Sequence, residues 1–110
     1  NVFGTLELTN AVLPLMRRQG YGRIIQNSSV LGLISLPFRG AYNASKHALE
    51  GLTDTLRLEL NATAIEVSLI EPGPITSQFR ANAYQQFLKN IDPKNSPFKA
   101  LYARLSKRLS

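Results

Sequence analysis

The chain has 110 residues, no cysteine and one histidine, and it carries 13 Lys or Arg residues against 7 Asp or Glu residues. This length supports one small domain, and the absence of thiols excludes disulfides and thiolate metal sites. The single histidine, His47, argues against a histidine-based site as well, so no metal site is expected.

The excess positive charge lies at one end of the sequence. Residues 1–79 hold six basic and six acidic side chains, whereas residues 80–110 hold seven basic side chains and one acidic one. We therefore divide the chain at this point into residues 1–79 and a basic region, residues 80–110. A basic region can serve nucleic acid or an anionic membrane surface, and it can equally be a solvated face.

The sequence before the basic region alternates between helix and strand patterns. Residues 1–18 form an apolar, helix-like run, after which Gly20 suits a left-handed cap. "RIIQNSS" predicts a short strand, residues 41–61 predict a second helix, and "IEVSLI" predicts a second strand. Helix, strand, helix, strand with short connections indicates a parallel α/β sheet.

The basic region predicts one amphipathic helix after a polar stretch. Ser96 can cap this helix and Pro97 suits its first turn. Apolar side chains then recur at helical spacing: Phe98, Leu101, Tyr102, Leu105 and Leu109. A basic face lies opposite, so residues 96–110 could also contact a membrane surface.

A serine, a tyrosine and a lysine are expected at one edge of the predicted sheet, because reactive groups of parallel α/β sheets collect at the carboxyl ends of strands. The first strand ends at Ser29, and the second helix begins near Tyr42. Lys46 follows four residues later, which puts the two stems about 6 Å apart on one helix face. An ammonium group favours a nearby phenolate, so the phenol could pass a proton to or from a carbonyl or alcohol oxygen. Alone, such a pair is also common on ordinary helix surfaces.

The combination of motifs is more specific than the pair. Ser29 precedes Tyr42 by thirteen residues, and "YNASKHAL" continues into "EGLTDTLRLEL" and then "VSLIEPGPITS". Over residues 1–80 this closely resembles the short-chain dehydrogenase/reductase family. The resemblance implies a segment of a Rossmann-like, doubly wound parallel sheet, followed by a helical region that covers the substrate pocket.

The resemblance also implies catalytic roles. Tyr42 matches the general acid/base, Ser29 matches the donor to the substrate oxygen, and Lys46 matches the group that favours the phenolate and holds the nicotinamide ribose. "NVFG" resembles the Asn-x-x-Gly motif of the family, which makes Asn1 the counterpart of the asparagine that anchors a proton-relay water.

"PGPITS" resembles the loop that receives the nicotinamide. Pro72 and Gly73 would shape the turn, and the backbone of Ile75 would meet the carboxamide. The family usually has threonine where this chain has Ser77, although a serine hydroxyl can make the same bond. Basic character around the site favours NADP over NAD only slightly.

The loop sequences look most like the hydroxysteroid, retinol and aldehyde-reducing branches of the family. The resemblance therefore implies an apolar carbonyl or alcohol substrate, with Leu31, Leu36 and Phe38 as candidate wall residues. Ordinary loop packing is the alternative for all three.

The glycine-rich turn that receives the pyrophosphate in the family is missing from these residues. The chain starts at Asn within an apolar run that has no cap and no signal-peptide pattern before it, so we expect a segment of a longer, cytoplasmic protein. Residues 1–18 and 41–61 match the helices that pair between subunits in the family, which implies a homodimer or homotetramer. The alternative function is an inactive interaction module built from these helices. Nucleic-acid binding is not expected, because no recognised motif accompanies the basic region.

Overall fold

The computed structural model describes residues 2–109, apart from the side chains at positions 105, 108 and 109. These residues form two compact units, one reaching to Pro74 and the other beginning at Ile75. Each unit is described separately below.

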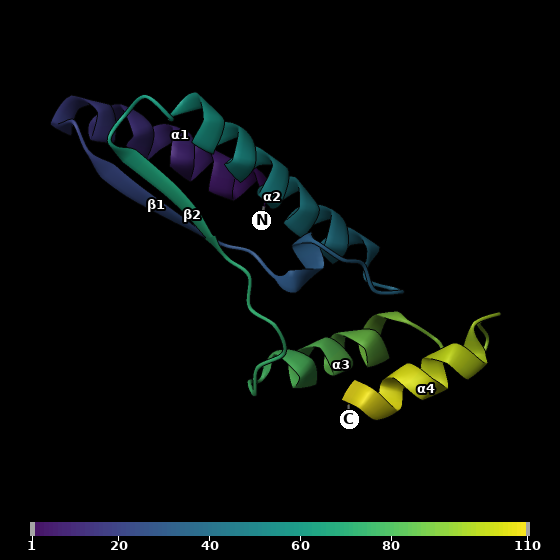
Figure 1. Ribbon diagram of the computed structural model, residues 1–110. Helices are drawn as coiled ribbons and strands as arrows, with labels where there is room; N and C mark the ends of the chain where they lie inside the picture. Colours follow the sequence, from purple (N-terminus) through teal and green to yellow (C-terminus); the bar gives the residue numbers. More distant parts are fainter. Residues whose placement is uncertain (1, 110) are drawn as a thin grey trace. The chain divides into compact units, whose positions relative to one another are not determined.

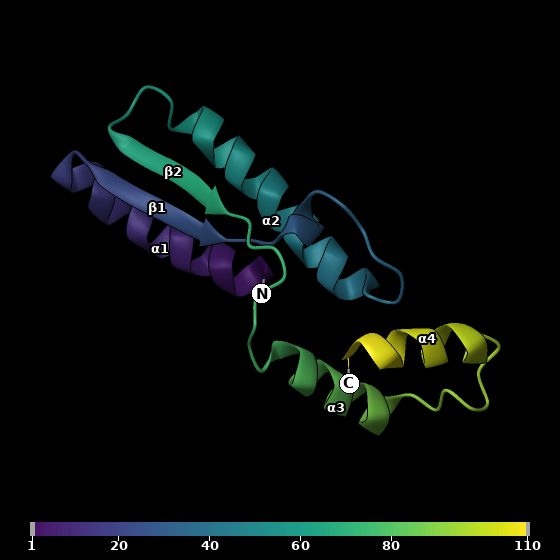
Figure 2. The same cartoon turned by 60° about the horizontal axis from the view of Figure 1, so that its bottom comes forward.

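The first unit contains two helices and a two-stranded parallel sheet (Figure 1). Helix α1 (Val2–Gln19) leads into β1 (Gly22–Asn27), and a short 3₁₀ turn, η1 (Val30–Gly32), precedes α2 (Gly40–Glu59) and β2 (Ile65–Ile70). The strands run side by side, as Figure 2 shows. Their register runs from Gly22 opposite Ile65 to Asn27 opposite Ile70. The predicted order of helix, strand, helix and strand is therefore confirmed.

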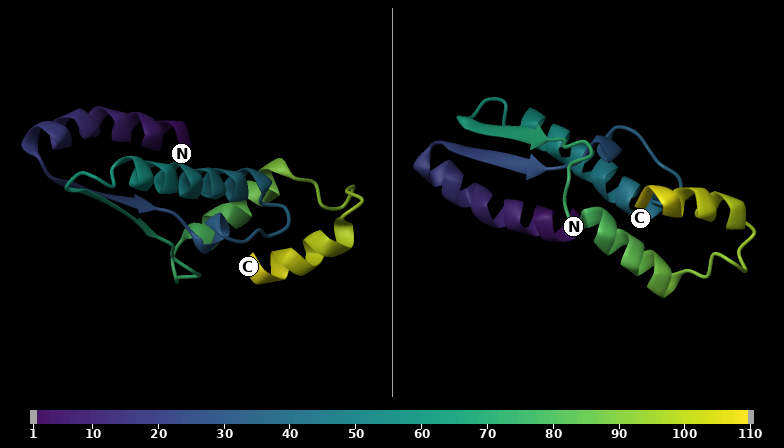
Figure 3. Two further views of the ribbon diagram at one scale, coloured as in Figure 1. Left: turned by 45° about the horizontal axis from the view of Figure 1, so that its top comes forward. Right: turned by 90° about the horizontal axis from the view of Figure 1, so that it is seen from below.

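Helices α1 and α2 both lie on the same face of this sheet (Figure 3). Alternating strand residues point to that face, because successive side chains of a strand point to opposite sides. Ile24, Ile65 and Val67 form the core with Leu60 from the end of α2. On the other face, Arg23 and Glu66 form an exposed ion pair of 2.6 Å across the strands.

Gly20 ends α1 as the sequence predicts. It adopts a positive φ of 83°, and its N–H donates to the carbonyl oxygen of Met16 at 3.0 Å. A residue without a Cβ reaches this left-handed conformation without strain. The chain can therefore reverse within two residues and enter β1.

The second unit consists of α3 (Phe79–Asn90) and α4 (Lys99–Leu109). The rings of Phe87 and Tyr102 join the two helices, with their centres 5.3 Å apart. Helix α3 was not predicted, although Tyr84, Phe87 and Leu88 within it follow the helical i, i+3, i+4 spacing. Helix α4 begins at Lys99, two residues after Pro97, where the sequence predicted its first turn. The Ser96 hydroxyl accepts from the N–H of Phe98 at 3.1 Å, just before the helix.

No helix within residues 2–109 is long and apolar enough to span a membrane.

Candidate functional site

The chain segments that leave β1 and β2 stay bonded to each other beyond the sheet. The N–H of Ser28 donates to the carbonyl oxygen of Ile70 at 2.8 Å, and the N–H of Val30 donates to that of Pro72 at 3.2 Å. These bonds hold the segment after β1 beside the turn after β2. Both are at the carboxyl end of the sheet, where parallel α/β proteins place their ligand sites.

Ser29 lies within this segment and is 8% exposed. It caps η1: its backbone is extended, with φ −164° and ψ 160°, and its hydroxyl oxygen accepts from the N–H of Leu31 at 3.2 Å. Serine favours this position because its short side chain satisfies an otherwise unpaired donor of the turn. A hydroxyl that accepts one bond keeps its own hydrogen to donate elsewhere.

Tyr42 and Lys46 lie one turn apart on α2, and both side chains are half-buried. The Lys46 ammonium nitrogen is 5.6 Å from the centre of the Tyr42 ring and donates to the carbonyl oxygen of Asn27 at 3.1 Å. The structure thus holds the ammonium group of Lys46 at the last residue of β1, with the ring of Tyr42 beside it.

Lys46 also lines a small hollow at the end of β1. The hollow has a volume of about 140 Å³, and its walls come from α1, β1 and α2: Thr5, Asn27, Ser45, Lys46 and Leu49. The residues around this hollow include a lysine, a threonine and a serine, and the Ser45 hydroxyl donates to the carbonyl oxygen of Tyr42 at 2.8 Å. Such donors suit the hydroxyls of a ribose.

The loop between η1 and α2 is tied to the start of α2. The side-chain amide nitrogen of Asn43 donates to the carbonyl oxygen of Leu36 at 2.8 Å. Phe38 adopts a positive φ of 61°, a conformation that is rare for bulky residues and that concentrates at functional sites. Leu36 and Phe38 are 40% and 44% exposed, whereas Leu31 is buried at 9%.

Three of the remaining candidates lie outside the first unit or outside the described residues. Asn1 lies outside the described residues. Gly73 belongs to the first unit, whereas Ile75 and Ser77 belong to the second. The Ser77 hydroxyl accepts from the N–H of Phe79 at 3.3 Å, at the start of α3.

Three polar residues at the site were not predicted as functional: Asn27, Ser28 and Asn43. Asn27 bonds Lys46, and Asn43 anchors the loop, while Ser28 bonds Glu50 on α2. Their only signal in the sequence is position: Ser28 and Asn43 directly flank Ser29 and Tyr42, and Asn27 lies two residues before Ser29. Among residues 2–109 no three His, Asp or Glu side chains gather in a way that could hold a metal ion.

A parallel α/β unit with polar side chains at the carboxyl ends of its strands is the architecture of the Rossmann-like, doubly wound class. The sequence model of the family described as "short chain dehydrogenase" matches residues 1–87. The chain belongs to this family, and the predicted fold class is confirmed.

Individual relatives agree with this assignment. The chain is 56% identical over 85 residues to an uncharacterised oxidoreductase, YbbO, of Escherichia coli strain K12. This match covers 77% of this chain and 32% of that protein. The chain is 39% identical over 114 residues to human retinol dehydrogenase 8, which covers 99% of this chain and 37% of that protein. The chain thus spans about a third of the length of these curated relatives.

The fold has a close counterpart among solved structures. A short-chain dehydrogenase/reductase from Burkholderia phymatum, solved in complex with NAD, superposes with a TM-score of 0.73 at 29% identity. The match covers 98% of this chain and 40% of that one.

Proposed function

We propose that the protein transfers a hydride between NAD(P)(H) and a carbonyl or alcohol substrate, with Tyr42 as general acid/base. The observation that supports this most directly is the Lys46 ammonium nitrogen, 5.6 Å from the centre of the Tyr42 ring and bonded to the end of β1. Family membership supports the reaction class, and this arrangement supports Tyr42 as the proton-transfer group at the carboxyl end of the sheet.

In the reducing direction the Tyr42 hydroxyl gives its proton to the carbonyl oxygen of the substrate, and in the oxidising direction its phenolate takes the proton of the alcohol. Lys46 stabilises that phenolate by its positive charge. The Ser29 hydroxyl donates a hydrogen bond to the same substrate oxygen, where negative charge develops. When bound, the nicotinamide coenzyme supplies or accepts the hydride.

The nicotinamide-ribose end of such a coenzyme fits the groups present. Lys46 and the hydroxyl-bearing hollow beside it would hold the ribose. Pro72 would shape the turn that receives the nicotinamide, since its carbonyl oxygen already bonds the segment that contains Ser29. The proposal also gives this site four further residues: Asn1, Gly73, Ile75 and Ser77. It includes a slight preference for NADP over NAD.

We further propose an apolar substrate such as an aldehyde, ketone, steroid or retinoid. Leu36 and Phe38 expose apolar side chains on the loop that leads to Tyr42. The name of the human relative, a retinol dehydrogenase, points in the same direction. We also propose that the second unit covers the bound substrate. A cytoplasmic location is a separate part of the proposal.

An interaction module remains the second candidate, because α1 and α2 carry exposed apolar side chains. Phe3 and Leu8 of α1 are 84% and 66% exposed, and Leu58 of α2 is 78% exposed. In the proposed enzyme these helices would form a homodimer or homotetramer. A monomer in sizing chromatography of the full-length protein would contradict both uses of this surface.

The proposed activity is tested by titrating the full-length protein with NADH and NADPH while following coenzyme fluorescence. Aldehydes, ketones, steroids and retinoids are then offered, and coenzyme oxidation is recorded. We expect saturable binding of at least one coenzyme and turnover of at least one apolar carbonyl. Absence of both would reject the proposal, and binding without any turnover would favour the interaction module.

A further inference from the structure

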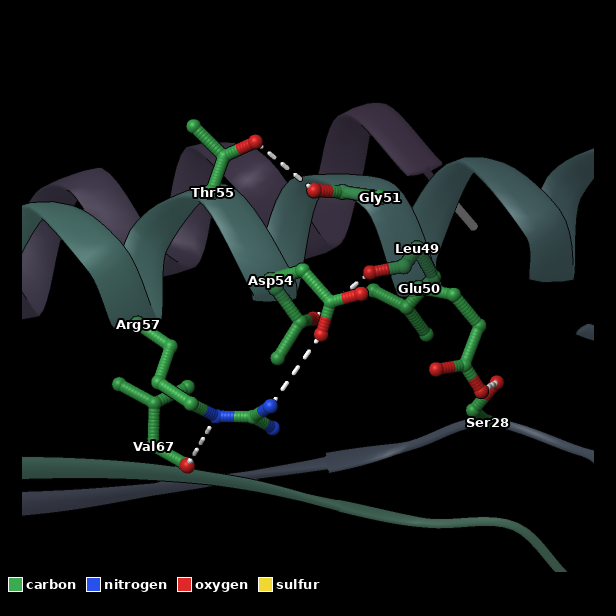
Figure 4. Close-up of polar contacts among 9 residues, drawn as sticks. Ser28, Leu49, Glu50, Gly51, Asp54, Thr55, Arg57 and Val67 are labelled. Atoms are coloured by element: carbon green, nitrogen blue, oxygen red, sulfur yellow. Dashed lines mark hydrogen bonds and ion pairs between the residues drawn. The ribbon is translucent and has the colours of Figure 1, made fainter.

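The structure contains a buried carboxyl group that the proposed chemistry does not use. Glu50 lies on α2 and is only 8% exposed, although glutamate is among the residues least often buried. Its Oε1 accepts a hydrogen bond of 2.9 Å from the hydroxyl of Ser28, which is 3% exposed (Figure 4). Burying a carboxyl group costs free energy unless it is hydrogen-bonded. Breaking this bond would leave a buried carboxyl group without its Ser28 partner, so the bond holds the Glu50 and Ser28 side chains in place.

The bond joins α2 to the residue directly before Ser29. One turn earlier on the same helix, Lys46 donates to the carbonyl oxygen of Asn27 at 3.1 Å. Lys46 and Glu50 therefore bond consecutive residues at the end of β1. Tyr42, Lys46 and Glu50 are spaced four residues apart and share one stripe of the helix.

The turn η1 packs directly against this bond. A Cβ added to Gly32 would lie 2.7 Å from Cγ of Glu50 and 3.0 Å from the Ser28 hydroxyl oxygen. Non-bonded carbon atoms pack at about 3.5–4.0 Å, so any larger residue would displace the Glu50 side chain. The glycine is required here for space, and η1 and Glu50 fix each other's positions.

We infer that Glu50 is a positioning residue, which holds the Ser28–Ser29 segment at a set distance from Tyr42 through its bond to Ser28. The inference rests on the proposed function, since it assigns Ser29 and Tyr42 to the same substrate oxygen. Lys46 and Glu50 together form a two-point attachment of the serine segment to α2. Loss of the Glu50 attachment would leave the Lys46 one intact and would let the Ser29 hydroxyl shift away from the substrate oxygen.

The kinetic test compares Glu50→Ala and Glu50→Gln with a control, Thr53→Val, in the full-length protein. Thr53 is 2% exposed on the same helix, and its hydroxyl donates to the carbonyl oxygen of Leu49 within that helix, away from the serine segment. Misplacement of a reacting group by about 1 Å costs on the order of 100-fold in rate. We therefore expect Glu50→Ala to lower kcat by about 10- to 100-fold, with unchanged coenzyme affinity.

Two further variants separate positioning from mere packing. Glu50→Gln keeps an acceptor for the Ser28 hydroxyl and should recover most of kcat. Ser28→Ala should lower kcat as Glu50→Ala does, and the double variant should lose no more than either single one, because both remove the same bond. Wild-type kcat in Glu50→Ala, or additive losses in the double variant, would overturn the inference. Thr53→Val should keep the wild-type kcat.

Hydrogen exchange gives a readout that does not depend on turnover. We expect Glu50→Ala to accelerate exchange of the amides of Ser28, Val30 and Leu31, whereas Thr53→Val leaves them at the wild-type rate. Unchanged exchange at these amides in Glu50→Ala would overturn the inference. If the wild-type protein turns over no substrate, the proposed function fails, and the exchange rates still decide whether Glu50 holds the segment.

Discussion

The ammonium nitrogen of Lys46 lies 5.6 Å from the centre of the Tyr42 ring, one helical turn along α2. The same nitrogen donates to the carbonyl oxygen of Asn27, which ties the half-buried Lys46 side chain to the end of β1. A pair of long side chains on the surface without such an anchor would be mobile, and its electrostatic interaction would be weak. The proton-transfer proposal depends on this anchored position.

Replacing Lys46 by methionine keeps the apolar stem and removes the charge. We expect kcat to fall by about 100-fold or more, because the phenolate of Tyr42 loses its stabilising charge. Coenzyme affinity should also weaken if Lys46 holds the ribose. The same substitution at Lys89, on the exposed surface of α3, is the matched control and should change neither quantity. Equal kinetics for both variants would exclude a role for the ammonium group.

Replacing Ser29 by alanine should have two separable effects. The lost donor to the substrate oxygen should lower kcat by about 100-fold or more, and the lost cap of η1 should reduce the free energy of unfolding by about 1 kcal/mol. Ser29→Thr keeps the hydroxyl and should recover much of the kcat and of the free energy of unfolding, as measured by steady-state kinetics and urea unfolding. An alanine variant that loses only stability would leave Ser29 with a structural role.

Two leucines near the end of α2 provide a test of the core. Leu60 is 2% exposed and packs against both strands, whereas Leu58 is 78% exposed. Leu60→Ala should lower the free energy of unfolding by about 2–5 kcal/mol, because it leaves a cavity. Leu58→Ala should change it by less than about 0.5 kcal/mol. If both variants lost a similar free energy of unfolding in urea, Leu58 would be buried as well, for example in a contact between subunits.

Two glycines should respond to alanine with opposite signs. Gly20→Ala should destabilise the protein by about 1 kcal/mol, because alanine is strained at a φ of 83°. Gly51 is exposed within α2, and a Cβ there would meet no atom within 4 Å. Gly51→Ala should therefore stabilise the protein by about 0.5–1 kcal/mol. Thermal unfolding midpoints that move in the same direction would contradict this account of both positions.

The sequence predicted the elements of the first unit well because their patterns are local. "IEVSLI" matches β2, and Gly20 caps α1, as periodicity and turn chemistry indicated. Helix α3 was not predicted because its apolar pattern, Tyr84, Phe87 and Leu88, is short and stands among polar residues; the ring of Phe87 packs on that of Tyr102 from α4. Tertiary contacts decide such segments.

The site shows the same division between local and distant information. The spacing of Tyr42 and Lys46 indicated a shared helix face, and the structure shows the contact. Glu50 was not singled out from the sequence, yet it is buried and bonds Ser28, which lies 22 residues earlier in the chain. A hydrogen bond between two segments leaves no periodic signal in either one.

The most direct test of the central claim is the kcat of Tyr42→Phe in the full-length protein, measured with coenzyme affinity in the same preparation. Phenylalanine keeps the ring beside Lys46 and removes only the hydroxyl that exchanges the proton. The account predicts that coenzyme still binds while kcat falls by at least about 100-fold. Undiminished turnover with normal coenzyme binding would show that Tyr42 is not the general acid/base.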